Sequence, residues 1–289
     1  MKASNIGYTR PRSLTQAFEI LAENDAAVPL AGGQSLMVAL NMRLSAPQLV
    51  VDIGELEELS QFSCVGDTVV LGALTRHRQI LESELLREKV PLLPKAAAHI
   101  AHAGIRNRGT LGGSLAYADP SAELPACAVA LGATIVIGSL QGTREIKAET
   151  FFKGLFETDL QAGELILGVK IPVIVASTSI AFAELARRQG DFAIAGVTAV
   201  ATMAQAQIKS AQFVYFGCTD FPRPANRVAA AVMGLKSPLA AGAELDTAVG
   251  QDINPSDTAG MRGDTKRHLA TVLTRRALDQ LFGSEARDV

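Results

Sequence analysis

The sequence predicts an α+β protein that is divided into several units, each with its own core. Three observations support this class: an early strand–helix pattern, a more β-rich stretch after it, and three apolar strands followed by an amphipathic helix near the end. The chain has 289 residues, enough for one large domain or two to three smaller ones. Its 48% apolar and 19% charged residues are ordinary for a folded protein of mixed class.

The first unit, residues 1–57, is predicted from strands and helices that alternate. Ser13 can cap a helix that runs to about Asn24, because apolar residues recur there at spacings of three and four. The elements expected after it are a strand at 28–31, a helix at 35–44 and a strand at 49–53.

The second unit, residues 58–176, is richer in β-structure. Its pattern is helical between 81 and 100, where Pro91 and Pro94 interrupt it because proline lacks the backbone donor of a helix. The other expected elements are strands at 67–71, 134–137 and 164–171 and a helix at 126–131.

The third unit, residues 177–289, follows a boundary that we expect within 173–179. Three apolar runs at 180–185, 195–206 and 212–218 predict antiparallel strands. An amphipathic helix is expected at 269–282, where apolar residues repeat every four positions, and a polar loop at 250–264.

Composition excludes several classes of function. The net charge of −2 gives no global field for nucleic acid or an anionic membrane. No apolar run is long enough to span a bilayer, and the N-terminal residues lack the apolar core of a signal peptide. The three cysteines are far apart and the four histidines form no HExxH motif, so we expect no protein-bound metal and a reducing, cytoplasmic location.

The segment LAGGQSL, residues 30–36, is the first candidate for ligand binding. Gly32 and Gly33 lack Cβ atoms, so a ligand can approach the main chain, and successive N–H groups can form an anion nest. Gln34 and Ser35 would add donors where the next helix starts. This chemistry suits a diphosphate.

The segment GTLGGSLA, residues 109–116, is the second candidate. Its two glycines, expected in a turn, lie between the hydroxyls of Thr110 and Ser114. Both segments together could face one extended dinucleotide, although neither matches GxGxxG or the P-loop. From the residues alone, plain structural turns remain an open alternative.

For several basic residues near these segments, more than one interpretation remains open. Arg106 and Arg108 could neutralise a diphosphate, pair with a partner, or be solvated surface residues. His77 could lie near a cofactor or cap a helix, and His102 could tune a bound ring or be structural. No serine or cysteine stands at a revealing spacing from a histidine, so acyl transfer has little support.

In combination, these segments resemble a known family. LAGGQSL, then NMRLSAPQLVVDIG and IRNRGTLGGSLAYADPSAELP, are similar to the FAD-binding stretches of carbon monoxide dehydrogenase medium subunits and of the flavin domain of xanthine dehydrogenase. GELILGVKIP (163–172) and AFAELARRQGDFAIAGVTA (181–199) extend the likeness over essentially the whole chain. The resemblance implies a vanillyl-alcohol-oxidase/PCMH-type fold, in which two α+β subdomains bind FAD and a C-terminal α+β domain covers it.

The resemblance also implies which residues contact FAD. Residues 30–36 would hold the diphosphate, and 110–114 the diphosphate and ribityl chain. Glu123 matches an acidic contact, and Ala183 stands where xanthine dehydrogenase has a lysine, so that contact is absent. The implied contacts are Leu30, Ala31, Gly32, Gly33, Gln34, Ser35, Leu36, Ile100, Thr110, Leu111, Gly112, Gly113, Ser114, Glu123, Ile166 and Phe192.

The implied function is electron transfer with no catalytic residue acting on the organic substrate. FAD on this chain would take electrons from [2Fe–2S] clusters of a small partner subunit, while a large subunit with molybdopterin oxidises the substrate. The implied assembly is a dimer of heterotrimers, a heterohexamer. Two alternatives are a stand-alone flavoenzyme, similar to UDP-N-acetylenolpyruvoylglucosamine reductase, and a scaffold that has lost FAD. The substrate stays open.

Overall fold

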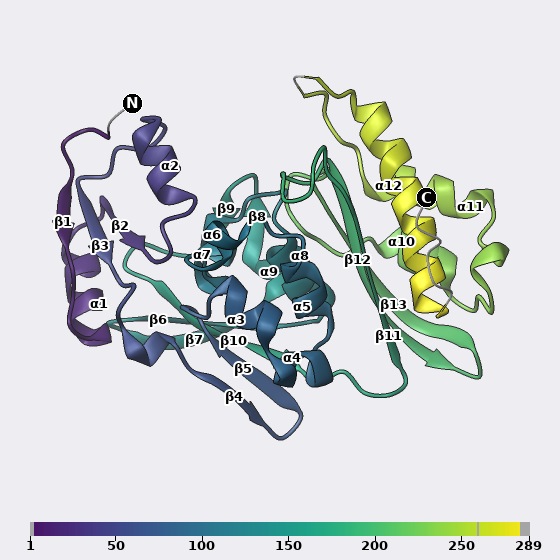
Figure 1. Ribbon diagram of the computed structural model, residues 1–289, viewed down its shortest axis with the longest axis horizontal. Coiled ribbons are helices and arrows are strands. Elements are labelled where there is room, and N and C mark those ends of the chain that lie inside the picture. Colours follow the sequence, from purple (N-terminus) through teal and green to yellow (C-terminus); the bar gives the residue numbers. More distant parts are fainter. Residues whose placement is uncertain (1–2, 259, 284–289) are drawn as a thin grey trace.

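The computed structural model describes residues 3–258 and 260–283, and its elements form three successive groups (Figure 1). Each group contains one of the three larger β-sheets, in sequence order from the N-terminal group through the central one to the C-terminal one. A further, two-stranded sheet belongs to the central group. The predicted α+β class is confirmed. The ends of the predicted first and third units, residues 1–2 and 284–289, lie outside the described residues.

The first group is a parallel sheet in the order β1-β3-β2 with two helices. The predicted cap of α1 is confirmed, because the Ser13 hydroxyl accepts a hydrogen bond from the N–H of Gln16 at 3.2 Å. The elements are β1 Gly7–Thr9, α1 Leu14–Glu23, β2 Ala27–Leu30, α2 Leu36–Asn41, β3 Leu49–Asp52 and the 3-10 helix Glu57–Leu59.

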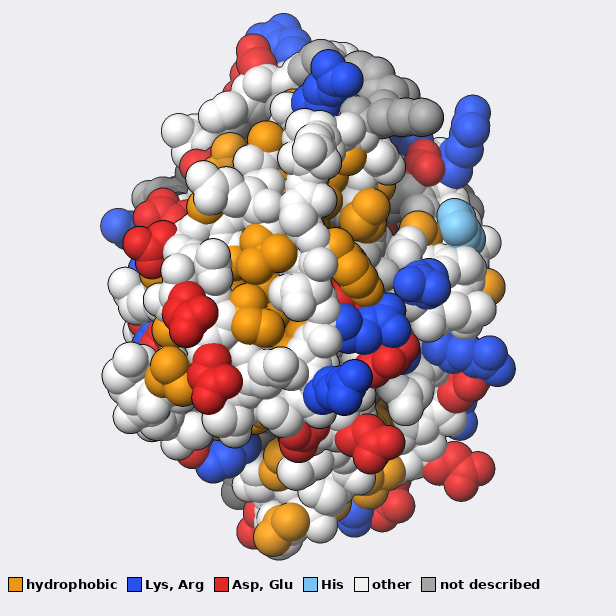
Figure 2. All heavy atoms as spheres, turned by 90° about the vertical axis from the view of Figure 1, so that its left-hand side faces the viewer, with side chains coloured by type: hydrophobic (Ala, Val, Ile, Leu, Met, Phe, Trp, Pro, Cys, Tyr) orange, Lys and Arg blue, Asp and Glu red, His pale blue; other side chains and the backbone are white. Residues whose placement is uncertain are grey.

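Helix α2 and the residues just after it leave apolar side chains in solvent. It is shorter than predicted, and the exposed fractions of Val38, Met42 and Leu44 are 54%, 52% and 75%. Figure 2 views the molecule from the side of this first group, and apolar side chains are grouped there among charged ones. An exposed apolar surface of this kind is typical of a contact with another protein.

The central group is an antiparallel sheet in the order β4-β5-β10-β6-β7, covered by short helices. Helices α5 and α8 are almost fully buried in its core. Its strands are β4 Phe62–Val65, β5 Thr68–Gly72, β6 Thr134–Ser139, β7 Gly142–Lys147, β8 Phe152–Gly154, β9 Glu157–Thr158 and β10 Leu165–Pro172. Its helices are α3 His77–Glu82, α4 Glu84–Lys89, α5 Leu92–Ala97, α6 Ala103–Arg106, α7 Leu111–Tyr117, α8 Glu123–Ala130 and α9 Ala148–Phe151.

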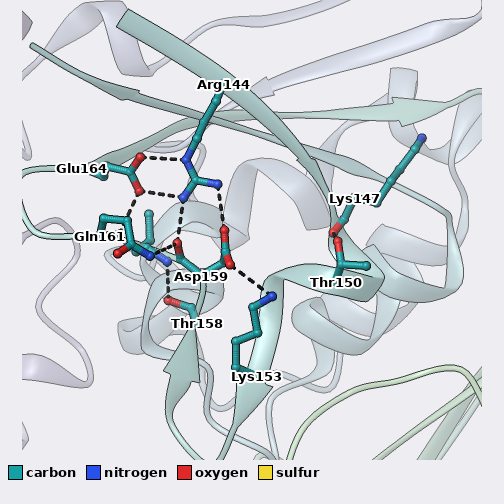
Figure 3. A network of polar contacts seen from close by, with 9 residues as sticks. Arg144, Lys147, Thr150, Lys153, Thr158, Asp159, Gln161 and Glu164 are labelled. Carbon is teal, nitrogen blue, oxygen red and sulfur yellow. Dashed lines mark hydrogen bonds and ion pairs between the residues drawn. The ribbon is translucent and has the colours of Figure 1, made fainter. Parts of the chain in front are cut away.

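An ion-pair network anchors the start of β10 to the hairpin of β6 and β7 (Figure 3). Arg144 on β7 donates two hydrogen bonds of 2.7 Å to Glu164 and one of 2.8 Å to Asp159. Lys153 on β8 also pairs with Asp159, at 3.1 Å. Arg144 holds the pKa of both carboxyls below its ordinary value. The network thereby fixes the strand that carries Ile166.

The C-terminal group is an antiparallel sheet in the order β11-β12-β13, as predicted. Helix α12 packs against β11 and β12, while α8 of the central group packs against β12 and β13. The predicted loop at 250–264 is partly wrong, because α11 extends to Asp252 and α12 begins at Gly263. The elements are β11 Thr178–Leu185, β12 Ala195–Ala204, β13 Gln207–Phe216, α10 Asn226–Val232, the 3-10 helix Pro238–Ala240, α11 Ala243–Asp252 and α12 Gly263–Leu281.

Within residues 3–258 and 260–283, no helix combines the length and the apolar character that a membrane crossing requires.

Candidate functional site

The first glycine segment, residues 30–36, connects β2 to α2 and leaves its backbone donors unused. Gly33 has a φ of +72°, in the left-handed region that favours glycine. The Gln34 side chain donates to the Gly32 carbonyl at 3.0 Å, which braces the turn. Among the described residues, none accepts a hydrogen bond from the backbone N–H groups of residues 31–36. These groups are free to bind an acceptor from outside the protein.

The second glycine segment, residues 109–114, is not the turn that the sequence predicts. Gly112 and Gly113 lie inside helix α7, and Thr110 caps this helix by accepting a hydrogen bond from the Gly113 N–H at 3.1 Å. The Leu111 and Gly112 N–H groups donate to the carbonyls of Thr75 and Ala73 at 2.9 and 2.8 Å. The N–H groups of this segment are therefore largely used within the protein.

The two segments lie directly against each other. A Cβ on Gly32 would stand 2.2 Å from the Arg108 carbonyl oxygen and 2.9 Å from the Cα of Gly109. A Cβ on Gly113 would stand 3.8 Å from the Cβ of Ala31. The structure thus brings together two segments that the sequence separates widely, as a shared dinucleotide site requires.

Close packing explains Gly32 and Gly112. Gly32 has no room for a side chain because the Arg108 carbonyl lies against it. Gly112 has no room either, because a Cβ there would lie 2.5 Å from the Cβ of Ala73. Valine at either position would disturb the fold itself, whether or not a ligand binds. Gly33 and Gly113 are the glycines whose surroundings are less crowded by backbone.

Of the other predicted contacts, Ile100 and Phe192 lie in loops where the central and C-terminal groups meet, whereas Ile166 lies on β10 of the central sheet. Ile100 and Ile166 are buried in the central core, at 7% and 5% exposure. Phe192 is 73% exposed on the C-terminal group. The loops that carry Ile100 and Phe192 touch, because a Cβ on Gly190 would lie 2.7 Å from the Ala101 carbonyl oxygen. The structure therefore brings the loops of Ile100 and Phe192 together at this seam, while the contacts of all three residues with a cofactor stay predictions.

Two acidic side chains are buried at the same seam. Burial, together with the nearby charge of Glu184, raises the pKa of Glu123, at the start of α8, to about 8. Burial also raises the pKa of Glu184, on β11, to about 7. One oxygen of Glu184 has no hydrogen-bond partner, and His99 Nδ1 is 3.8 Å away. A buried acid without a partner suits contact with a ligand that donates a hydrogen bond.

The charged candidates have mixed outcomes. Arg106 is structural, because its guanidinium donates to the carbonyls of Ile100 and Ala101 at 2.7 and 2.8 Å. Arg108 and His102 are exposed. Arg76 was not among the predicted candidates, although its guanidinium donates a hydrogen bond to the Arg108 carbonyl. Nothing local marks Arg76, because its partner is 32 residues away in the chain.

The residues present fit an FAD diphosphate. Neither segment contains an acidic residue, the first presents unused N–H donors, and the exposed Arg108 immediately precedes the second. Donor groups and cations are what a doubly charged acceptor requires. The isoalloxazine ring would need apolar and polar neighbours of the kind that the seam provides.

Family models match both parts of the chain. Residues 4–174 match the FAD binding domain in molybdopterin dehydrogenase, and residues 180–281 match the CO dehydrogenase flavoprotein C-terminal domain. The first match alone covers more than half of the chain.

Full-length relatives agree with the family models. The glyceraldehyde dehydrogenase medium chain of Sulfolobus acidocaldarius is 34% identical over 281 residues, which cover 97% of this chain and 100% of the relative. Caffeine dehydrogenase subunit beta of Pseudomonas sp. is 36% identical over 280 residues, which cover 96% and 95%. Both names denote dehydrogenase subunits, which favours an electron-transfer subunit over a stand-alone flavoenzyme.

Solved structures share the whole fold. Quinoline 2-oxidoreductase from Pseudomonas putida 86 has a chain with a TM-score of 0.93 and 33% identity, covering 99% of this chain and 100% of that one. Carbon monoxide dehydrogenase from Hydrogenophaga pseudoflava has one with a TM-score of 0.95 and 29% identity, with the same coverage. With two touching glycine segments, family models that match both parts of the chain and relatives of similar length, this chain belongs to the FAD-binding medium subunits of the molybdenum hydroxylases.

Proposed function

We propose that this chain holds one FAD across residues 30–36 and 110–114 and passes electrons from [2Fe–2S] clusters of a small partner subunit to an external acceptor. The observation that carries the proposal is the run of unused N–H groups at residues 31–36, pressed against the second glycine segment. Bound FAD supplies a carrier that accepts electrons one at a time and releases one or two. The chain's own residues bind it, orient it and shield it.

The flavin end of the site is proposed at the seam between the central and C-terminal groups. Glu123 offers a buried, protonated carboxyl, while Ile100 and Ile166 offer apolar contact. Phe192 offers an exposed aromatic ring from the other side of the seam. We propose no acid or base on the organic substrate, because that chemistry belongs to the large molybdopterin subunit.

We further propose that residues 1–57, 58–176 and 177–289 act as two FAD-binding subdomains and a covering domain. One large sheet in each range supports this division. The proposed partners are the large molybdopterin subunit and the small [2Fe–2S] subunit, as a dimer of heterotrimers in the cytoplasm. The exposed apolar side chains of α2 and of the residues just after it, next to the first glycine segment, suit a surface that another subunit covers.

The first test is which part of the cofactor the chain recognises. The purified chain is freed of flavin and titrated with FAD, FMN and riboflavin while flavin fluorescence is followed. Because the diphosphate is held by the N–H groups of residues 31–36, we expect FAD to bind at least about 100-fold more tightly than FMN. Equal affinity for FMN and FAD, or no binding of FAD, would contradict the proposal.

A pair of glycine variants separates the site from general strain. Gly33 and Gly66 both have positive φ, +72° and +56°, so alanine strains the backbone at either position. Gly66 lies in the β4–β5 hairpin with open space around it, whereas a Cβ on Gly33 would lie 3.2 Å from Met37 and 3.3 Å from Leu30. We expect Gly33→Ala to weaken FAD binding about tenfold or more and Gly66→Ala to leave it unchanged. Equal affinities would remove residues 30–36 from the site.

A further inference from the structure

The second glycine segment is held from behind by the connection between β5 and α3, residues 73–77. This connection runs beside residues 108–112 and receives the N–H groups of Gly112 and Leu111 on its own carbonyls. In return, the His77 N–H donates to the Gly109 carbonyl at 3.0 Å. The two stretches are therefore joined in both directions by backbone hydrogen bonds.

His77 adds a side-chain contact to this connection. Its Nε2 lies 3.1 Å from the Thr110 carbonyl oxygen, and because a carbonyl only accepts, Nε2 carries the proton and donates. The side chain is buried, and burial lowers the pKa of His77 to about 4, against the opposing effect of the Thr110 carbonyl. His77 is thus a neutral donor at physiological pH.

The imidazole also supports Gly109 directly. A Cβ on Gly109 would stand 2.9 Å from both Cε1 and Nδ1 of His77, so the ring edge lies against the glycine. His77 Nδ1 has no hydrogen-bond partner among the described residues, which fits a ring whose position is set by packing and by the Thr110 carbonyl. The imidazole ring thereby fixes the position of the backbone at Gly109 and Thr110.

Arg76 connects these contacts to the first glycine segment through the Arg108 carbonyl. Its guanidinium donates to the Arg108 carbonyl, the same oxygen that stands 2.2 Å from the Cβ position of Gly32. Residues 76 and 77 thereby hold the carbonyls of Arg108, Gly109 and Thr110, and Arg108 in turn abuts Gly32. The spacing of the two segments depends on this set of contacts.

We propose that His77, assisted by Arg76, is a positioning residue for FAD: it holds the second glycine segment at the distance from the first that the cofactor requires. The inference rests on the proposed function, since it concerns the same cofactor. It assigns to His77 no contact with FAD and no proton transfer. Its effect on binding is transmitted through the Gly109 and Thr110 carbonyls.

The test compares His77 with a buried hydrogen bond elsewhere. His77→Leu removes the donor to Thr110, while Thr274→Val removes a buried hydrogen bond of 2.7 Å to Tyr215 between α12 and β13. We expect both variants to melt earlier, but only His77→Leu to weaken FAD binding, about tenfold. His77→Gln, which keeps a donor, should recover a large part of that loss. Equal FAD affinity for His77→Leu and the unmodified chain, or an equal loss in Thr274→Val, would overturn the proposal.

A second variant covers the case in which His77→Leu does not fold. Arg76→Met removes the contact with Arg108 from a half-buried side chain and leaves no polar group behind. In the FAD-free chain, we expect faster amide hydrogen exchange at residues 109–113 and no change in α12. Unchanged exchange at 109–113 would overturn the proposal. If the unmodified chain itself bound no FAD, the proposed function would fail instead, so the two failures are distinguishable.

Discussion

The two glycine segments have similar sequences, but among the residues described their backbone N–H groups are in opposite situations: unpaired in the first and mostly hydrogen-bonded in the second. In residues 30–36 the backbone N–H groups find no acceptor within the described residues, and Ser35 makes no capping hydrogen bond. In residues 109–114, two N–H groups (Leu111 and Gly112) and two carbonyls (Gly109 and Thr110) are engaged by the 73–77 connection, and Thr110 caps α7. A Gly-Gly pair therefore serves one segment by exposing donors and the other by allowing close packing. We infer that the first segment offers backbone donors to FAD, while the second offers the same cofactor a surface that the protein already holds fixed.

The largest effect is expected where the segments touch. Gly32→Ala would place a Cβ 2.2 Å from the Arg108 carbonyl, so one segment must move away from the other. We expect a loss of about 4 kcal/mol in the free energy of unfolding, measured by denaturant titration, together with loss of FAD binding. Gly242→Ala, where a Cβ meets nothing within 4 Å, is the control and should change little. A stable Gly32→Ala chain would show that the contact between segments is not required.

Lowering the pH should destabilise the chain through His77, which contacts the second glycine segment. The pKa of His77 is about 4 in the fold, against 6.5 for an unperturbed histidine, so the unfolded chain takes up the proton first as pH falls. The stability from neutral His77 is complete above pH 6.5 and is lost between 6.5 and 4, amounting to about 3 kcal/mol. Unfolding free energies at several pH values check this. His77→Gln should lack that part of the slope, and an identical slope would contradict the assignment.

Glu123 should show the opposite dependence on pH. Its folded pKa of about 8 lies above the ordinary 4.5, so the stability from the protonated acid is complete below pH 4.5 and is lost as pH rises to 8. Glu123→Gln should therefore stabilise the FAD-free chain by roughly 2 kcal/mol at pH 8 and by almost nothing at pH 4. Thermal melts at the two pH values measure it. Destabilisation at pH 8 would mean that the carboxylate has a partner in the folded chain.

The smallest expected change in stability comes from removing the hydroxyl of Thr110 or of Ser35, one in each segment. Thr110 Oγ1 accepts from the Gly113 N–H, whereas Ser35 makes no capping hydrogen bond. Thr110→Val should cost about 1 kcal/mol of stability in the FAD-free chain, and Ser35→Ala less than about 0.5 kcal/mol. If Ser35→Ala were the more costly change in denaturant unfolding, the contrast between the segments would be wrong.

The sequence predicted the elements whose signals are local. Ser13 and the three-and-four spacing after it predicted α1, and long alternating runs predicted β11, β12 and β13. The family resemblance predicted the class of subunit. These signals succeed because a cap, a helical face and a strand pattern are each written within a few neighbouring residues.

The missed features depend on contacts made across the chain. Gly112 and Gly113 do not favour a helix, yet both lie in α7, where Ala73 occupies the space that a side chain on Gly112 would need. β1 is three residues long and forms through its pairing with β3. The role of Arg76 depends on a carbonyl in another element. No local pattern contains that information.

Amide hydrogen exchange of the chain with and without FAD tests the difference between the segments most directly. We expect residues 31–36 to exchange fast in the FAD-free chain and to become protected when FAD binds, because the cofactor supplies their missing acceptors. Residues 111–114 should be protected in both states, because the protein already engages their N–H groups. Slow exchange of residues 31–36 without FAD, or no added protection with it, would contradict the binding role of the first segment.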